Sequence, residues 1–332
     1  MRKRAFHAAG VLCVVVLTCS TVSAQPAKPK FGSIPPRFNQ ASDLPDLSGL
    51  VWLGGNRFLA VHDAKIEDEV SNPRVSVIEL PANSKGVRWL NRTPNLHELG
   101  SNDLESAARI PGTQDVLLLE SGDDLQDPAY QRIFQVRVVG NSVHVVATAQ
   151  WPVSISNVEG SAIAAVGGRF VFLFAERAQN LPTTQLRWAF FEPETLRFGS
   201  FNSVTVANPN PAAYNRPIVA MDVDSRGRIY IAAAFDAEAA ELPDPDNGPF
   251  ASAVYRIGTV RATTSGAVVE LLDVPVLAGT MDGFKVESVA IREDAERGVQ
   301  IFVGLDDENY GSTLRLLPEP PNGSASVAFV SY

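Results

Sequence analysis

Short apolar runs dominate the chain after the first forty or so residues, and glycine, proline, asparagine or aspartate interrupts them roughly every 8–12 residues. Windows with the periodicity of an amphipathic helix are scarce. Short strands at such spacing are typical of β-sandwiches, β-barrels and β-propellers. The pattern therefore predicts an all-β protein, and internal repeats must decide among the three architectures.

Five segments share one outline, in which a small or acidic residue opens an apolar strand and a carboxylate closes the strand that follows a turn. The segments are 46–65, 103–123, 157–177, 217–238 and 285–309. Their opening positions are Ser48, Glu105, Glu159, Ala220 and Glu287, and their closing carboxylates are Asp63, Glu120, Glu176, Asp236 and Asp306. The openers are 57, 54, 61 and 67 residues apart. A period near 60 with one hairpin per repeat predicts propeller blades.

Further pairs of apolar runs fill the intervals between the repeats. They are 74–80 with 86–90, 132–139 with 142–149, 186–191 with 197–206, 253–257 with 268–274, and 313–317 with 326–332. Each repeat then holds four strands, which is one complete blade. The sequence predicts a single propeller domain over residues 41–332 with five four-stranded blades, and a sixth, degenerate blade around residues 178–215 is the alternative.

The N-terminus has the order of a secretory signal peptide. Basic residues at positions 2–4 precede an apolar run over 8–19 and small residues that end at Ala24. We therefore predict a signal peptide over residues 1–24, a Pro-rich leader over 25–40, and a periplasmic or secreted protein. No later run is long enough to span a membrane. Lipid attachment at Cys19 is the alternative.

The cysteine positions and the net charge exclude several kinds of functional site. Both cysteines, Cys13 and Cys19, lie in the predicted signal peptide, so the mature chain has no thiol for catalysis, disulfides or zinc. The net charge of −9 becomes −12 when the three basic residues of the leader are removed. An acidic chain is unsuited to nucleic acid and is suited to a cation. We expect a monomer.

In a propeller, the first strand of a blade lines the channel and the second returns beside it, so the opener and the closer share one end. We therefore predict a ring of metal-binding carboxylates at one channel mouth: Asp63, Glu105, Glu120, Glu159, Glu287 and Asp306. Oxygen ligands without sulfur indicate Ca²⁺, or else Mg²⁺. The alternative is that these acids cap strand ends or pair with neighbouring basic residues, namely Arg109, Arg177 and Lys285.

The ring is expected to be broken in the fourth repeat. Ala220 stands there in place of glutamate, with Asp222 two residues on and so on the same face of the strand. His62 is either a general base or a packed side chain that points away from Asp63, because adjacent residues of a strand face opposite sides. No tryptophan falls at the predicted mouth, which argues against a sugar platform; the four are Trp52, Trp89, Trp151 and Trp188.

Residues 46–317 resemble a phytase-like β-propeller family described as having esterase-like activity. The segments SGL…FLAVHD, DLES…LLLESGD, NVEGSAI…FLFAER and KVESVAI…IFVGLDDEN…STLRLL carry the resemblance. It implies a secreted hydrolase that cleaves phosphate or carboxylic esters with bound Ca²⁺. The positions that match the acidic motif of the family are Glu105, Glu159, Glu287 and Asp306. Ser106 and Ser288 stand where the family has glycine after glutamate.

These observations favour a Ca²⁺-dependent hydrolase of phosphate or other small esters. Glu105 or Glu287 would serve as general base, and basic residues beside the mouth would hold a small anionic substrate; these are Lys65, Arg177 and Lys285. Two alternatives stay open. One is a non-catalytic propeller that binds a glycan, a peptide or another ligand of the cell envelope, and the other is a lactonase.

Overall fold

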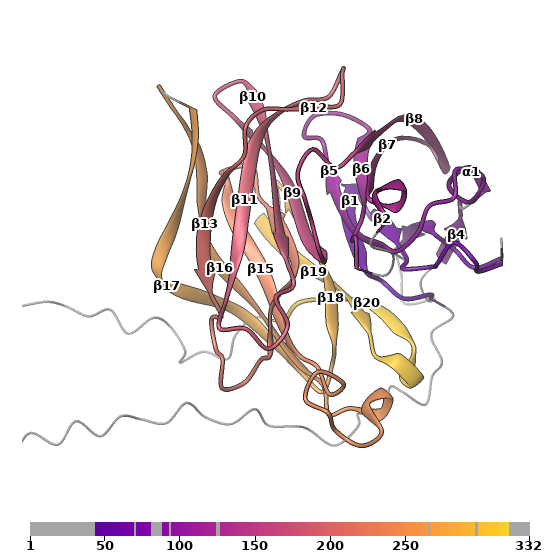
Figure 1. Ribbon diagram of the computed structural model, residues 1–332, viewed down its shortest axis with the longest axis vertical. Helices are drawn as coiled ribbons and strands as arrows, with labels where there is room; N and C mark the ends of the chain where they lie inside the picture. Colours follow the sequence, from indigo (N-terminus) through magenta and orange to yellow (C-terminus); the bar gives the residue numbers. More distant parts are fainter. Residues whose placement is uncertain are drawn as a thin grey trace, which may run out of the picture.

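The computed structural model describes residues 44–69, 71–80, 88–92, 94–123, 127–264, 266–295 and 298–318. Their strands form five antiparallel sheets, which we number as blades 1 to 5 in chain order (Figure 1). Blades 1 and 2 contain β1 (Gly49–Gly54), β2 (Arg57–Val61), β3 (Val75–Glu79) and β4 (Arg88–Asn91), then β5 (Leu104–Arg109), β6 (Asp115–Glu120), β7 (Arg132–Val139) and β8 (Ser142–Gln150).

The remaining blades follow the same order from the channel outward. Blade 3 contains β9 (Val158–Val166), β10 (Arg169–Glu176), β11 (Thr183–Glu192), β12 (Arg197–Phe198) and β13 (Asn202–Ala207). Blades 4 and 5 contain β14 (Arg216–Val223), β15 (Arg228–Phe235), β16 (Ala251–Thr263) and β17 (Gly266–Asp282), then β18 (Val286–Asp294), β19 (Gly298–Asp306) and β20 (Ser312–Leu316). Short helices occupy connections: α1 (Pro94–Glu98), η2 (Pro128–Tyr130), η3 (Pro245–Asn247) and η4 (Glu308–Tyr310).

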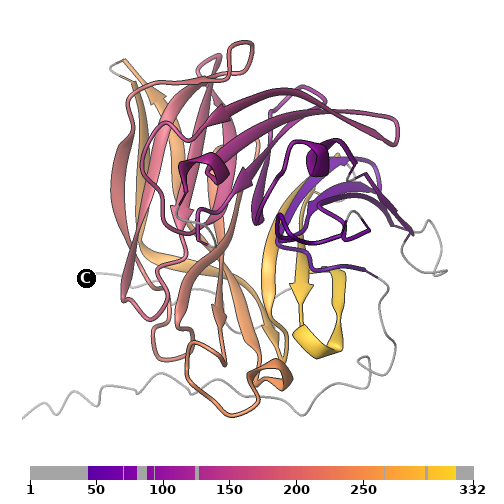
Figure 2. The same cartoon turned by 45° about the vertical axis from the view of Figure 1, so that its right-hand side comes forward.

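The five sheets close into a ring. The innermost strand of each blade contacts the innermost strand of the next, and β18 contacts β1. Blade 5 accordingly lies beside blade 1 in both views, although the two are far apart in sequence (Figures 1 and 2). The predicted five-bladed propeller is confirmed. No sixth blade forms over 178–215, because β11, β12 and β13 all belong to blade 3.

Three expectations fall on parts of the chain that the structure does not describe: the signal peptide over 1–24, the leader over 25–40 and the strand over 326–332. Blade 5 has three strands among the described residues. The segment before β1 is nevertheless attached to this blade. Leu44 forms an antiparallel bridge with Ser312, and the Ser288 hydroxyl donates to the carbonyl of Leu47 at 2.7 Å.

The core lies between neighbouring blades, so the middle strands are covered on both faces and read as continuous apolar runs. All six residues of β6 are buried. Near the axis the blades approach so closely that small residues are needed. A Cβ atom at Gly49 would lie 2.9 Å from the backbone nitrogen of Ala107 in blade 2. Among the described residues, no helix is both long and apolar enough to cross a bilayer.

Candidate functional site

Three glutamates reach one mouth of the channel because each sits in a β-bulge. Leu104 pairs with Glu120 and Ser106 with Leu119, so Glu105 is the extra residue between the two pairs. The same irregularity surrounds Glu159 in β9 and Glu287 in β18. A bulge leaves one residue outside the ladder and re-aims its side chain. The start of three inner strands therefore directs a carboxylate to the same mouth.

The second strand of each hairpin also directs a side chain to this mouth. The residue that does so lies at the same position of the strand pairing in each of these blades. In blade 5, Asp306 lies two residues after the partner of Ser288, and Asp63 lies two residues after the partner of Gly49 in blade 1. The equivalent position in blades 2 and 3 holds Ser121 and Arg177. The repeated feature is thus a position that faces the mouth, and it carries a carboxylate in two of these four blades.

The closing carboxylate of blade 2 departs from the predicted ring. Glu120 precedes Ser121, and a shift of one residue along a strand moves the side chain to the other face. Glu120 is fully buried and forms an ion pair with Arg132 at 2.6 Å. Its oxygens also accept the backbone N–H groups of Asn102 and Arg132, at 2.9 and 2.8 Å. These partners hold the Glu120 side chain inside blade 2, away from the mouth.

We call the charged residues that do meet at this mouth the rim cluster. Its eight carboxylates are Asp63, Asp103, Glu105, Glu159, Asp236, Glu287, Asp306 and Glu308, and its four basic residues are Lys65, Arg177, Arg216 and Lys285. Carboxylates outnumber cations two to one. Such a site repels anions and attracts cations unless protons or a bound ion reduce the excess negative charge.

Three of the carboxylates converge. One oxygen from each of Asp63, Asp103 and Glu105 lies within 4.8 Å of the others. Asp103 adopts a left-handed backbone conformation (φ 57°), accepts a hydrogen bond from Ser121 and pairs with Lys65. By contrast, neither Asp63 nor Glu105 makes a hydrogen bond or an ion pair with any residue that the structure describes. Two unpaired carboxylates and one fixed carboxylate therefore share one small volume.

The carboxylates of this mouth also have raised pKa values. Burial and the neighbouring charges of Glu159, Asp103 and Asp63 hold the pKa of Glu105 well above its usual range. Burial likewise raises the pKa of Asp63 to about 6, although Lys65 opposes the shift. The pKa of Glu159 is raised to about 7 by burial in spite of the charge of Arg177. Protons, or a cation in their place, are therefore favoured in this mouth at neutral pH.

The basic residues of the rim cluster are all engaged by acids. Arg177 contacts Glu159 at 3.1 Å and Asp123 at 3.5 Å. Lys285 contacts three carboxylates, those of Glu287, Asp306 and Glu308. Burial would lower the pKa of Lys285, but these acids hold it well above its usual range. The acids thus stabilise the charged forms of Arg177 and Lys285 and fix their side chains in place.

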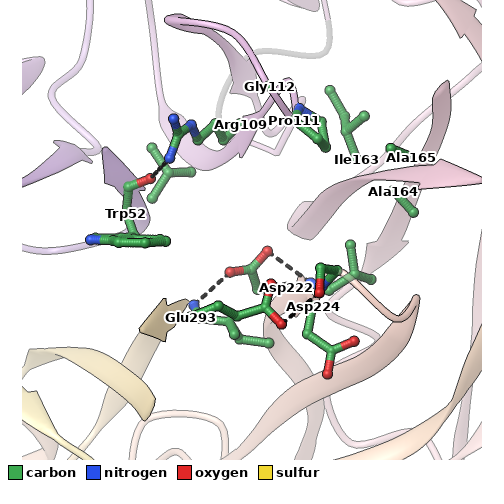
Figure 3. Close-up of a pocket in the computed structure, with 14 residues that line it drawn as sticks. Trp52, Arg109, Pro111, Gly112, Ile163, Ala164, Ala165, Asp222, Asp224 and Glu293 are labelled. Atoms are coloured by element: carbon green, nitrogen blue, oxygen red, sulfur yellow. Dashed lines mark hydrogen bonds between the residues drawn. The ribbon is translucent and has the colours of Figure 1, made fainter. Parts of the chain in front are cut away.

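One expectation about the basic residues beside the acids was wrong. Arg109 and Asp222 lie at the opposite mouth of the channel, which we call the far mouth (Figure 3). Arg109 therefore cannot neutralise the rim acids. Asp222 does share a face of β14 with Ala220, as expected, because the pairing is regular from Ala220 to Val223 and the bulge of β14 lies before it, between Arg216 and Ala220. Asp222 stands beyond it, near the other end of the strand.

His62 is a packed histidine. Its ring nitrogens contact the backbone carbonyl of Asp46 and the hydroxyl of Ser76, the latter at 2.8 Å. Burial lowers the pKa of His62 to about 4. Asp63 faces the rim cluster and His62 faces the blade interior, as alternation along the strand predicts.

Three members of the rim cluster were missed from the sequence: Asp103, Arg216 and Glu308, the last of which contacts Lys285. Asp103 lies two residues before Glu105 in the segment DLES, and this spacing was the available signal. Arg216 immediately precedes the fourth repeat and joins Asp236 to Glu287. It supplies positive charge in the blade that lacks the glutamate. Only the long insertion at the bulge of β14 brings Arg216 to the mouth, and the repeat alignment did not show it.

Comparison with known proteins supports the architecture. The sequence matches no family model and no curated protein. Solved structures are similar in fold. A thermostable family-43 glycoside hydrolase has 9% identity, a TM-score of 0.50, and coverage of 84% of this chain and 91% of its own. An exo-1,5-α-L-arabinanase from a bovine ruminal metagenomic library has 10% identity, a TM-score of 0.47, and coverage of 82% and 92%. At 9% identity, the likeness to the family-43 glycoside hydrolase supports the propeller fold alone.

Proposed function

We propose that the protein is a Ca²⁺-dependent hydrolase of small anionic esters that acts at the rim cluster. The observation that carries the proposal is the convergence of Asp63, Asp103 and Glu105 with two of the three carboxylates unpaired. Half-buried carboxylates that repel one another and have no protein partner are costly, and a divalent cation lowers the cost. The resemblance of residues 46–317 to the phytase-like family supports the same reaction class.

The donor set fits Ca²⁺. This ion prefers six to eight hard oxygen ligands at about 2.3–2.6 Å, so two oxygens on one ion lie at most about 5 Å apart. The separations among Asp63, Asp103 and Glu105 satisfy this limit. Water and the substrate would complete the coordination. When bound, such an ion polarises an ester oxygen and lowers the pKa of bound water.

Charge explains why the ion would be required. With eight carboxylates against four basic residues, the mouth repels an anionic substrate. Arg177 and Lys285 lie beside the converging acids, and each is held by a carboxylate. They therefore provide positive charge at fixed positions and are not free to move toward a substrate. Lys65, bound to Asp103, is the third such cation. A phosphate or carboxylic ester would be held only where these cations and a bound ion act together.

The carboxylates divide into two roles. Glu105 has no ion pair with any residue that the structure describes and would accept a proton from the attacking water. The water oxygen forms the new bond to phosphorus or to the carbonyl carbon, and the leaving alkoxide takes up a proton. Glu287 contacts both Arg216 and Lys285, at 3.3 and 3.1 Å. We assign Glu287 to positioning these cations rather than to proton transfer.

The test is turnover of phosphate esters, carboxylic esters and lactones by the purified protein, with Ca²⁺ and with EDTA. We expect Ca²⁺-dependent hydrolysis of an anionic ester, and a loss of kcat of about 100-fold or more in Glu105→Gln. Glu194→Gln, an exposed glutamate distant in sequence from the rim residues, is the matched control.

Two results would contradict the proposal. A Ca²⁺-dependent rise of Tm without turnover of any substrate would identify a binding propeller whose mouth holds an ion. If Ca²⁺ does not change Tm at neutral or alkaline pH, the protein has no Ca²⁺ site at the rim cluster. Preference for lactones over acyclic esters would favour a lactonase.

A further inference from the structure

The far mouth of the channel contains a cavity that is separate from the rim cluster. Its volume is about 320 Å³, and it lies at the ends of the inner strands opposite to the glutamate bulges. Trp52, Arg109, Asp222, Asp224 and Glu293 contribute its aromatic and charged walls (Figure 3). A cavity of this size with a few polar groups is typical of a site for a small molecule.

One side of the cavity presents a cation without a carboxylate partner. Arg109 donates to the carbonyls of Trp52 and Thr113, at 2.8 and 3.2 Å, and forms no ion pair with any described residue. Its guanidinium lies 5.9 Å from the centre of the Trp52 ring, and the indole N–H donates to Gly55 at 3.0 Å. The ring and the guanidinium are thus fixed beside each other at the wall.

The other side presents two carboxylates, Asp222 and Glu293, that form no ion pair with a described residue. Asp222 accepts hydrogen bonds only from the backbone N–H groups of Val223 and Ile291, both at 2.7 Å. Glu293 accepts from the backbone and hydroxyl of Ser225, at 2.9 and 2.8 Å. The third carboxylate, Asp224, is neutralised by Arg228. Neither Asp222 nor Glu293 contacts a basic side chain among the described residues.

The opposed walls are complementary to a molecule that carries both charges. Figure 3 shows Trp52 and Arg109 on one side of the cavity, with Asp222 and Glu293 on the other. We propose that the far mouth binds a small zwitterion such as a free amino acid, with its carboxylate on Arg109 and its ammonium group between Asp222 and Glu293. An apolar side chain would pack on Trp52 and on Ile163.

The physical basis is the cost of unpaired charge. A charge taken out of water is stable only when it is paired, and an ammonium group supplies what Asp222 and Glu293 lack. A ligand carboxylate forms two parallel hydrogen bonds with a guanidinium, which gives the pair direction as well as strength. An amine alone or an acid alone would leave one wall uncompensated. Recognition therefore depends on both charges in one ligand.

The experiment is isothermal titration calorimetry of the purified protein with three ligands that share one carbon skeleton: leucine, isoamylamine and isocaproate. We expect leucine to bind at least about tenfold more tightly than either singly charged analogue. Glucose serves as the uncharged comparison. Binding should be unaffected by EDTA, which separates this site from the rim cluster and keeps its failure distinct from failure of the hydrolase proposal.

Variants localise the site. We expect Asp222→Asn and Arg109→Gln each to weaken leucine binding by about tenfold or more, and Arg109→Lys to retain part of the affinity because it keeps the charge. Asp273→Asn, an exposed aspartate on β17, is the matched control. Thermal unfolding of each variant verifies that it folds. Equal binding of leucine and isoamylamine, tighter binding of glucose, or no binding of leucine at millimolar concentration would overturn the proposal.

Discussion

The rim cluster and the far mouth both place carboxylates at an end of the same channel, but they compensate the charge in different ways. At the rim, most carboxylates contact a basic side chain, as Asp236 and Glu287 contact Arg216. At the far mouth, Asp222 and Glu293 accept hydrogen bonds from backbone groups and from Ser225, without a cation. One end therefore depends on ion pairs, and the other on neutral donors.

The difference follows from the local chain. The bulges at the starts of the inner strands push several carboxylates into one mouth, where mutual repulsion must be offset by cations. At the opposite end, Asp222 caps the backbone N–H of Ile291 in the neighbouring blade and needs no counter-charge for that task. We expect the rim to respond strongly to charge removal and to divalent ions, and the far mouth to respond weakly to both.

The largest effect is expected from removal of a rim cation. Arg216 is buried between Asp236 and Glu287, and Arg216→Met leaves the buried Asp236 without a cation and Glu287 with Lys285 alone. We expect a loss of about 3–5 kcal/mol in the free energy of unfolding, measured with urea. Arg109→Met, which removes hydrogen bonds to two carbonyls at the far mouth, should cost about 1 kcal/mol. Equal losses would contradict the distinction between the mouths.

Ca²⁺ should stabilise the protein through the rim only. At a free concentration about 100 times Kd, the expected gain is about 2.7 kcal/mol, read from the rise of Tm. Asp63→Asn should abolish the gain because it removes one of the three converging carboxylates. Asp222→Asn at the far mouth should retain it. A gain that survives Asp63→Asn would place the ion elsewhere on the protein.

Stability should also fall as pH rises. Burial raises the pKa of Asp63 to about 6, of Glu159 to about 7 and of Asp306 to about 8. The folded state therefore holds protons that the unfolded chain releases near pH 4. Their contribution is complete below that pH and is lost as pH rises through these folded values.

We expect the free energy of unfolding to decrease continuously between about pH 5 and about pH 9, measured with urea in the absence of Ca²⁺. Burial also raises the pKa of Asp222 to about 7, so the far mouth acts in the same direction. Asp306→Asn measures the contribution of the rim cluster, and Asp222→Asn measures that of the far mouth. Asp306→Asn should reduce the pH dependence of the free energy of unfolding more than Asp222→Asn does. A stability that increases over this range would contradict the assignment.

The sequence was sufficient for the architecture because the repeat period and the short apolar runs recur in every blade. It was also sufficient for the glutamates, since Glu105, Glu159 and Glu287 occupy the same bulge in their blades. These features are local, and each hairpin carries its own copy. Placement at a common mouth then follows from the parallel arrangement of the inner strands around the axis.

The second strands could not be assigned to a face from sequence because the closing carboxylates differ by one residue in register. Glu120 aligns with Leu305 rather than with Asp306, and this shift moves it from the mouth into the blade. Turn lengths vary between repeats, so the register is visible only in the strand pairing. The contribution of Arg216 was hidden for the same reason, since it depends on the size of the bulge in β14.

The smallest effect is expected at the edge of the far mouth. Ser225→Ala removes the hydroxyl that donates to Glu293 at 2.8 Å, but the backbone N–H of residue 225 still donates to the same carboxylate at 2.9 Å. Both side chains reach water, so the lost hydrogen bond is replaced by solvent, and urea unfolding should show a change of about 0.5 kcal/mol. Glu293→Gln, which removes the charge but keeps an acceptor, should cost a similar amount. A loss of stability as large as that of Arg216→Met would mean that the contact between Ser225 and Glu293 is essential for the packing of blade 4 against blade 5. In that event the carboxylate of Glu293 would be committed to the fold and unavailable to a ligand.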